Sequence, residues 1–137
     1  VENKLGSDWP VRVATEIWDD SSALDMVVVN DCPAPTNCVT VHWSDLPDGT
    51  LGRTVKSYDS AGRIISADVR ISDSIIPDYD EHRKTALIRH EIGHTLAFAH
   101  TETKTDVMYP IIEKDGPLNL AERHTTILRD TYGAPDD

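Results

Sequence analysis

The segment RHEIGHTLAFAH, residues 89–100, constrains this chain more than any other feature. It contains three histidines and a glutamate, and the residues between them are small or apolar. An apolar helix that is rich in histidine by chance and a metal site are the two interpretations of such a segment. The spacing of its polar residues favours the second.

Residues four positions apart lie on one face of a helix, separated by about 6 Å along its axis. His90 and His94 have this spacing, so their imidazoles can bind one ion. Zinc binds neutral imidazole and, when catalytic, combines three protein ligands with a water molecule. Glu91 directly follows His90, where a carboxylate can take a proton from that water. The spacing is therefore compatible with a metal site that has its own general base, while an apolar helix without metal stays open at this point.

The candidate third ligand is His100, six residues after His94. On a continuous helix this spacing places a side chain on roughly the opposite face, about 9 Å further along the axis. The helix must therefore end between the two histidines if all three bind one ion. A residue in the left-handed region ends a helix in this way, and that residue is usually glycine. Here we expect the break at Ala97.

A methionine and a tyrosine follow in TDVMYP, residues 105–110. HEIGHTLAFAH and DVMYP together resemble the metzincin metallopeptidases, whose motif H-E-x-x-H-x-x-G-x-x-H precedes a methionine-containing turn. The Met-Tyr-Pro form and the ending ILRDTYG are similar to the matrixin branch. The resemblance implies a zinc-dependent endopeptidase with one catalytic zinc ion, three histidine ligands, a glutamate general base and a methionine beneath the metal. These residues are His90, His94, His100, Glu91 and Met108.

The resemblance also implies where a protein or peptide substrate binds. Tyr109 and Pro110 would form the wall of the pocket for the side chain just after the scissile bond. Ile111 and the isoleucine after it lead us to expect bulky apolar side chains in that pocket. The strand ADVRIS, which contains Ala67 and Val69, is expected to hold an extended peptide along its edge by strand addition.

The remaining patterns predict an α+β fold, with a small, mostly antiparallel or mixed twisted sheet, a backing helix, an active-site helix and a C-terminal helix. Helical spacing, β-branched runs and turn residues define these elements. In chain order they are a helix in 7–22, strands at 24–31 and 38–44, a hairpin over 54–72 that turns at 60–62, a helix in 78–100 that must end before His100, and a helix in 119–132. A short strand at 11–13 is the alternative to the first helix.

A length of 137 residues suits one domain. We expect a single metallopeptidase catalytic domain over 1–137, with a sheet-containing part of about 1–95, a second part of about 96–137 and the zinc cleft between them. The formal charge of −11 argues against a nucleic-acid partner, and no apolar run approaches the roughly 20 residues that insert into a membrane. We expect a monomer.

Cys32 and Cys38 flank the short loop CPAPTNC, which can close as a disulfide in an oxidising compartment, with two free or buried thiols as the alternative. We therefore expect a secreted, extracellular protein, and the polar start of the chain is not a signal peptide. The segments DLPDGTLG and EKDG predict turns, because neither has a full set of oxygen ligands for calcium.

Three alternatives remain open at this stage. A zinc-binding peptide-recognition module of the same fold would lack turnover, although Glu91 would then have no use. A gluzincin-type peptidase would take its third ligand from a downstream glutamate, for which Glu122 is the candidate. A plain core helix would bind no metal. The remaining histidines, His42, His82 and His124, are expected to be surface or interface residues.

Overall fold

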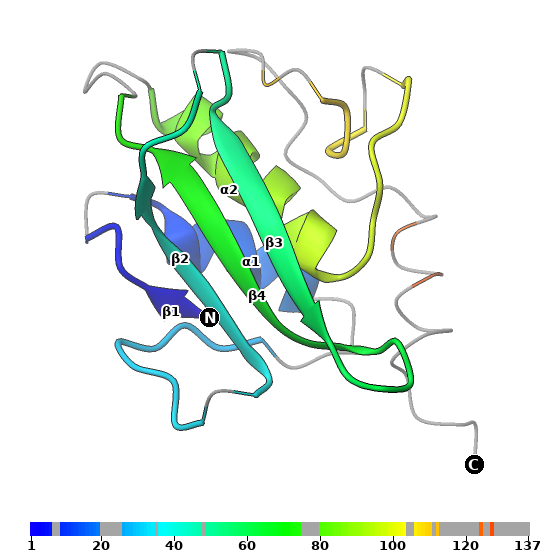
Figure 1. Ribbon diagram of the computed structural model, residues 1–137. Coiled ribbons are helices and arrows are strands. Elements are labelled where there is room, and N and C mark those ends of the chain that lie inside the picture. The colour runs from blue at the N-terminus through cyan, green and yellow to red at the C-terminus, as the bar shows by residue number, and fades with distance from the viewer. Residues whose placement is uncertain are drawn as a thin grey trace.

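The computed structural model describes residues 1–6, 9–19, 26–34, 36–47, 49–74, 80–103, 106–110, 112, 124 and 127. Within these residues the order of elements is β1 (Glu2–Asn3), α1 (Val11–Asp19), β2 (Cys38–Ser44), β3 (Gly52–Tyr58), β4 (Ile64–Ser72) and α2 (Glu81–Thr95). Both helices lie on the same side of the sheet (Figure 1). This architecture confirms the predicted α+β class.

The sheet is mixed, with the strand order β1-β2-β4-β3. The pairs β1–β2 and β2–β4 are parallel, whereas β3 and β4 form an antiparallel hairpin. The hairpin turns over 59–63, where the Asp59 carboxylate accepts hydrogen bonds from the backbone N–H groups of Ala61 and Arg63. In the described part of the chain, β3 therefore forms one edge of the sheet and β4 is central.

The core lies between the sheet and the two helices. The apolar face of α1 packs into it, which confirms the predicted helix and excludes the alternative strand at 11–13. Fully buried apolar side chains come from α1, β2, β4 and α2, and they include Val11, Ala14, Trp18, Val41, Val69, Ile71, Leu87, Ile88 and Ile92. This core holds α2 against the inner face of the sheet.

Helix α2 lies within the predicted range 78–100 and ends before His100, as expected. Asp80 caps its N-terminus, because its side chain accepts a hydrogen bond from the backbone N–H of Arg83 at 2.8 Å. The helix ends at Thr95, before His100. Figure 1 shows the chain leaving the end of α2 and running back along the side of the helix.

The predicted strand at 24–31 is wrong for its described residues, 26–31. They contain a single β-bridge, between Val29 and Glu2. Val27 is 68% exposed, so the run of valines covers little of the core. Its neighbour β1 has only two residues, which leaves little backbone to pair with, and β propensity alone does not form a strand.

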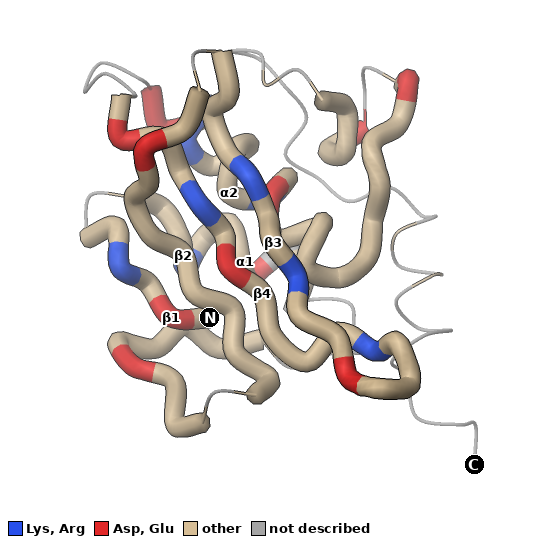
Figure 2. Tube along the Cα trace, in the orientation of Figure 1, with Lys and Arg blue, Asp and Glu red and all other residues tan. Residues whose placement is uncertain are grey.

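Charge is distributed unevenly over the fold. Figure 2 shows Lys and Arg along β3 and β4, while most of the described Asp and Glu residues lie in loops and at the ends of the strands. The acidic net charge is therefore not concentrated on β3, the edge strand beside α2.

None of the helices in the described residues is long and apolar enough to cross a membrane.

Candidate metal centre

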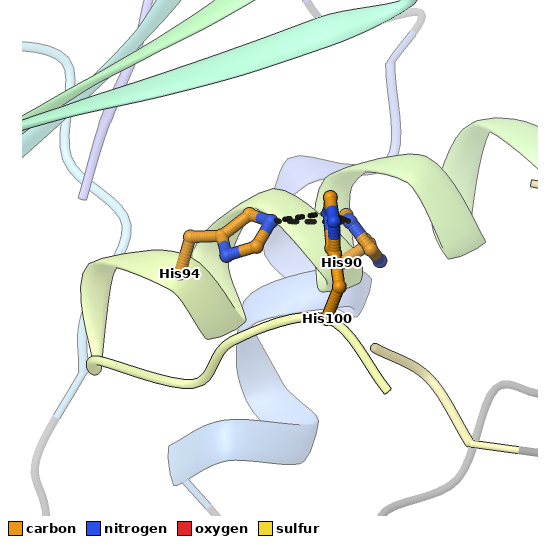
Figure 3. Close-up of side chains that lie close together, drawn as sticks. All are labelled: His90, His94 and His100. Carbon is orange, nitrogen blue, oxygen red and sulfur yellow. Dashed lines mark hydrogen bonds between the residues drawn. The ribbon is translucent and has the colours of Figure 1, made fainter. Parts of the chain in front are cut away.

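Three imidazole rings converge at the C-terminal end of α2 (Figure 3). The Nε2 atoms of His90 and His94 are 3.2 Å apart, and each lies 3.1 Å from Nε2 of His100. His90 is buried, His94 is half-buried and His100 is exposed, so the cluster opens towards solvent on one side. The group can hold a metal ion through one nitrogen from each ring.

The backbone at Ala97 brings His100 to the other two rings. Ala97 has a φ of 75°, in the left-handed region, as its position in the sequence predicted. The backbone N–H of Ala97 bonds to the carbonyl of His94 at 3.0 Å, and that of Phe98 bonds to Gly93 at 3.1 Å. This pair of bonds is the Schellman motif, which reverses the chain at a helix end. An alanine here takes the place that glycine usually occupies.

Hydrogen bonds at Nδ1 set the tautomers of two of the histidines. His90 Nδ1 lies 2.9 Å from the carbonyl oxygen of Val107, and His94 Nδ1 lies 2.8 Å from that of Phe98. A carbonyl oxygen can only accept, so each Nδ1 carries the proton and donates it. Nε2 is then left with a lone pair, and the lone pairs of neutral rings converge where a cation would satisfy them.

Burial keeps these two rings neutral. It lowers the pKa of His90 to about 4, against a smaller opposing effect of the hydrogen bond to Val107. Burial also lowers the pKa of His94. Neutral imidazole is the form that binds a metal ion, so both rings are ready for coordination at neutral pH without first losing a proton.

The spacing of the three nitrogens fits zinc. Tetrahedral coordination at about 2.0–2.1 Å requires ligand atoms roughly 3.3–3.4 Å apart. The observed separations of 3.1–3.2 Å are within a few tenths of an ångström of that value. Three protein nitrogens with an open side leave a fourth position for water or substrate, which is the arrangement of a catalytic zinc site.

Glu91 is nearly completely buried, with 5% of its surface exposed, and points towards the edge strand. The hydroxyl of Thr54 on β3 donates to its Oε1 at 2.8 Å. Burial raises the pKa of Glu91 to about 7, and the hydrogen bond from Thr54 opposes that rise. A carboxyl group poised near neutral pH can both take and return a proton.

Met108 is fully buried in a turn over 106–109, directly against α2. A Cβ atom at Gly93 would lie 2.4 Å from its sulfur and 2.9 Å from the ring of Trp18. Gly93 therefore has to be glycine for Met108 to pack at this depth. Sequence reasoning missed this residue, although a glycine in the middle of a helix is itself a signal of close packing.

Asp106 holds the same turn from the other side. Its Oδ1 accepts the backbone N–H of Met108 at 2.8 Å and lies 3.2 Å from Nε2 of His124. His124 is fully buried and packs edge-on against the rings of Trp18 and Phe98. The expectation that His124 is a surface or interface residue is wrong, because it packs under the Met108 turn.

A pocket of about 320 Å³ adjoins the histidine cluster. His90, Glu91 and His100 line it together with residues 49–52, which precede and begin β3, and with Pro110. Ile112 also lines it, whereas Ile111 lies outside the described residues. Tyr109 is half-buried beside Pro110.

Ala67 and Val69 do not lie at an edge. They belong to β4, which pairs with β2 on one side and β3 on the other, and they are 6% and 0% exposed. The prediction that this strand holds a peptide by strand addition is therefore wrong, because its backbone groups already bond to two neighbours. The edge strand is β3.

The cysteines form a disulfide between Cys32 and Cys38. Together with Glu2 these sulfurs also make a group with metal-ligand spacing, but bonded sulfurs are not thiolates and cannot serve as metal ligands. His42 lies against Asp68 on β4, distant in sequence from the three-histidine cluster. His82 lies in the first turn of α2.

A search among curated proteins gave no match. The profile of the matrixin family matches residues 16–133, which include the three histidines, Glu91 and Met108. Matrixins are zinc-dependent peptidases, and the three-histidine group of this chain can hold a metal ion. The chain belongs to the matrixin family.

Proposed function

We propose that this protein is a zinc-dependent endopeptidase that hydrolyses peptide bonds in proteins or peptides. The observation that carries the proposal is the convergence of three imidazole Nε2 atoms within 3.2 Å of one another, beside a pocket that Glu91 also lines. His90, His94 and His100 are the proposed ligands of one zinc ion. Zinc, when bound, lowers the pKa of a water molecule and polarises the scissile carbonyl.

Glu91 is the proposed general base and acid. Its carboxylate accepts a proton from the attacking water as the oxygen adds to the carbonyl carbon. It then donates that proton to the amide nitrogen as the carbon–nitrogen bond breaks, so that a carboxylic acid and an amine leave. In the metal-free protein burial already raises the pKa of Glu91, so this carboxyl group accepts a proton more readily than an exposed glutamate does.

Met108 is the proposed residue of a Met-turn, packed under the site. The buried thioether packs against Gly93 of α2, the residue before His94. No proton or electron passes through the sulfur in this proposal. Its role is to support the rings from below, because a gap there would let the ligands shift.

The proposed substrate path follows the edge strand β3. An extended peptide adds a strand to an open sheet edge through main-chain hydrogen bonds. β3 is such an edge among the described residues, and it borders the helix that carries Glu91. The residue after the scissile bond would enter the pocket lined by Pro110 and Ile112, and Tyr109 and Ile111 remain proposed parts of its wall. We expect bulky apolar side chains there.

We further propose a single catalytic domain that works as a monomer outside the cell. The disulfide between Cys32 and Cys38 supports an oxidising compartment. The two proposed parts of the domain, about 1–95 and about 96–137, would meet at the cleft that contains the histidines. One zinc ion is proposed as the cofactor, and nothing in the described part of the chain supports calcium.

The test uses Glu91→Gln, which keeps the size of the side chain and an oxygen acceptor for Thr54. Turnover of a peptide substrate by the zinc-loaded protein should fall about 10²–10⁴-fold, because the proton transfer is lost. The turnover of Glu91→Ala should fall by at least the same factor. Both variants should keep zinc, measured by metal analysis of the same samples. Near-normal turnover by the zinc-loaded variants would contradict the mechanism. An absence of turnover in the native protein would favour the alternative function, a peptide-binding module.

A further inference from the structure

The carboxylate of Glu91 is held from outside its own helix. In the described part of the chain, Thr54 is the one side chain that donates a hydrogen bond to it. The same hydroxyl lies 3.1 Å from the backbone carbonyl oxygen of Glu91. A buried carboxylate that lacked a hydrogen-bond donor would cost free energy, and the side chain could populate several rotamers. The Thr54 hydroxyl therefore stabilises one rotamer of Glu91.

Thr54 is suited to this task by its place in β3. Side chains alternate between the two faces of a strand, and Gly52, Thr54 and Lys56 point to the face that borders α2. Val55, on the other face, is 41% exposed. The antiparallel pairing of Thr54 with the fully buried Val69 fixes its backbone to the centre of the sheet. Thr54 thus links a rigid strand to the proposed general base.

Gly52 provides a second, independent constraint on the same carboxylate. A Cβ atom built at this residue would lie 3.0 Å from Cγ of Glu91 and 3.1 Å from both Cδ and Oε2. Gly52 and Glu91 both line the pocket beside the histidines. Its φ is not positive, so the glycine is not needed for the backbone conformation. What it supplies is space beside Oε2.

We propose that Thr54 and Gly52 of β3 are positioning residues for the Glu91 carboxylate, an inference that rests on the proposed peptidase function. Thr54 binds Oε1 and holds the carboxyl group in one orientation. Oε2 is then the oxygen left to exchange the proton, and the absence of a side chain at Gly52 keeps it uncovered. The edge strand that we propose to bind the peptide also aligns the base that takes the proton from the attacking water.

The experiment compares Thr54→Val with the conservative Thr54→Ser, each loaded with zinc. Thr54→Val should lower kcat roughly 10–100-fold, the usual effect of losing a partner that orients a catalytic group, with KM and zinc content within about twofold of the native protein. Thr54→Ser retains the hydroxyl and should stay within about threefold of native kcat. Gly52→Ala should lower kcat with zinc retained. An unchanged kcat in Thr54→Val, or a loss in Thr54→Ser as large as that in Thr54→Val, would overturn the proposal.

A second measurement does not depend on activity. The urea midpoints of the metal-free native protein, Thr54→Val, Glu91→Ala and the double variant form a double-mutant cycle. Glu91→Ala keeps the backbone carbonyl that Thr54 also contacts, so the cycle isolates the bond to the carboxylate. Thr54→Val should lower the midpoint more in the native background than in the Glu91→Ala background, and equal shifts would overturn the link. If the zinc-loaded native protein cleaves no peptide, the proposed function fails, while this cycle still decides whether Thr54 holds Glu91.

Discussion

The two halves of the histidine cluster are built by different means. His90 and His94 stand on α2, one turn apart, and regular helical geometry aligns them (Figure 3). We call α2 with these two residues the helix half. His100 lies on the segment that follows, residues 96–103 and 106–110, which we call the loop half. No regular backbone pattern positions that ring. Its place depends on the left-handed Ala97 and on the buried turn around Met108.

The loop half is the part of the site that is more easily disturbed by substitution. A helix that packs on a core keeps the spacing of its side chains even when a neighbour is changed, because each turn is held by its own backbone bonds. The loop half depends instead on a few specific residues, above all Ala97, Asp106 and the glycine that admits Met108. Changes at these residues should therefore affect His100 before they affect His90 and His94.

The largest effect on stability is expected for Asp106→Ala. It removes a buried carboxyl oxygen that accepts the Met108 N–H and lies against the buried His124, and losing a buried hydrogen-bond partner costs about 1–3 kcal/mol for each bond. Urea unfolding of the metal-free protein measures the loss. Asp106→Asn is the matched control, since its side-chain oxygen can still accept the Met108 N–H, and it should cost less. In Asp106→Ala, hydrogen exchange of the backbone amides should also accelerate more in the loop half than in α2, relative to the native protein. Equal acceleration in both halves would remove the distinction between them.

Gly93→Ala tests whether the helix half is shaped to receive the loop half. In an ordinary helix this change gains about 1 kcal/mol. Here the new methyl group would overlap the sulfur of Met108, so we expect a net loss of about 1–3 kcal/mol. Thermal or urea unfolding gives the sign directly. In a Met108→Ala background the same change should cost less, and the cost that remains should come from the ring of Trp18. A gain in stability for Gly93→Ala alone would rule out the packing described for this turn.

The division of the site into a helix half and a loop half could largely be predicted from the sequence. The spacing of His90, His94 and His100 required the helix to end near Ala97, and Ala97 does adopt a positive φ. The helix at α2 and the hairpin of β3 and β4 follow from local patterns, and the structure confirms both. These features depend on residues close together in the chain, which is the range over which propensity and periodicity carry information.

The features that were missed depend on contacts between distant residues. The strand that contains Val69 was expected at an edge of the sheet, but it lies between β2 and β3. The alternation of side chains shows which face of a strand is buried and does not show which strands lie beside it. The buried position of His124 requires the rings of Trp18 and Phe98, which come from far earlier in the chain. The valines at 27–29 have strong β propensity but lie next to a two-residue strand.

The smallest expected effect is that of Ala97→Gly. An alanine held at a φ of 75° is strained by about 1–2 kcal/mol, and glycine would remove that strain from the folded state. Glycine also gives the unfolded chain more conformational freedom, which offsets part of the gain in stability. We expect a stabilisation of up to about 1 kcal/mol in the metal-free protein, measured by urea unfolding. Ala99→Gly is the control, because Ala99 is equally exposed and lacks a positive φ, and it should destabilise slightly. A loss at both positions would show that the left-handed turn at Ala97 is not strained.

The central claim is that the loop half completes a zinc site that the helix half cannot form alone. The most direct measurement is the zinc affinity of the native protein and of His100→Ala, obtained by competition with a chromogenic chelator. We predict one zinc ion per chain in the native protein. In the variant we predict an affinity more than about a hundredfold weaker, since losing a ligand should cost more than the 10–100-fold typical of losing its hydrogen-bond partner. If His100→Ala binds zinc as tightly as the native protein, His100 is not a ligand, and the proposed site is wrong.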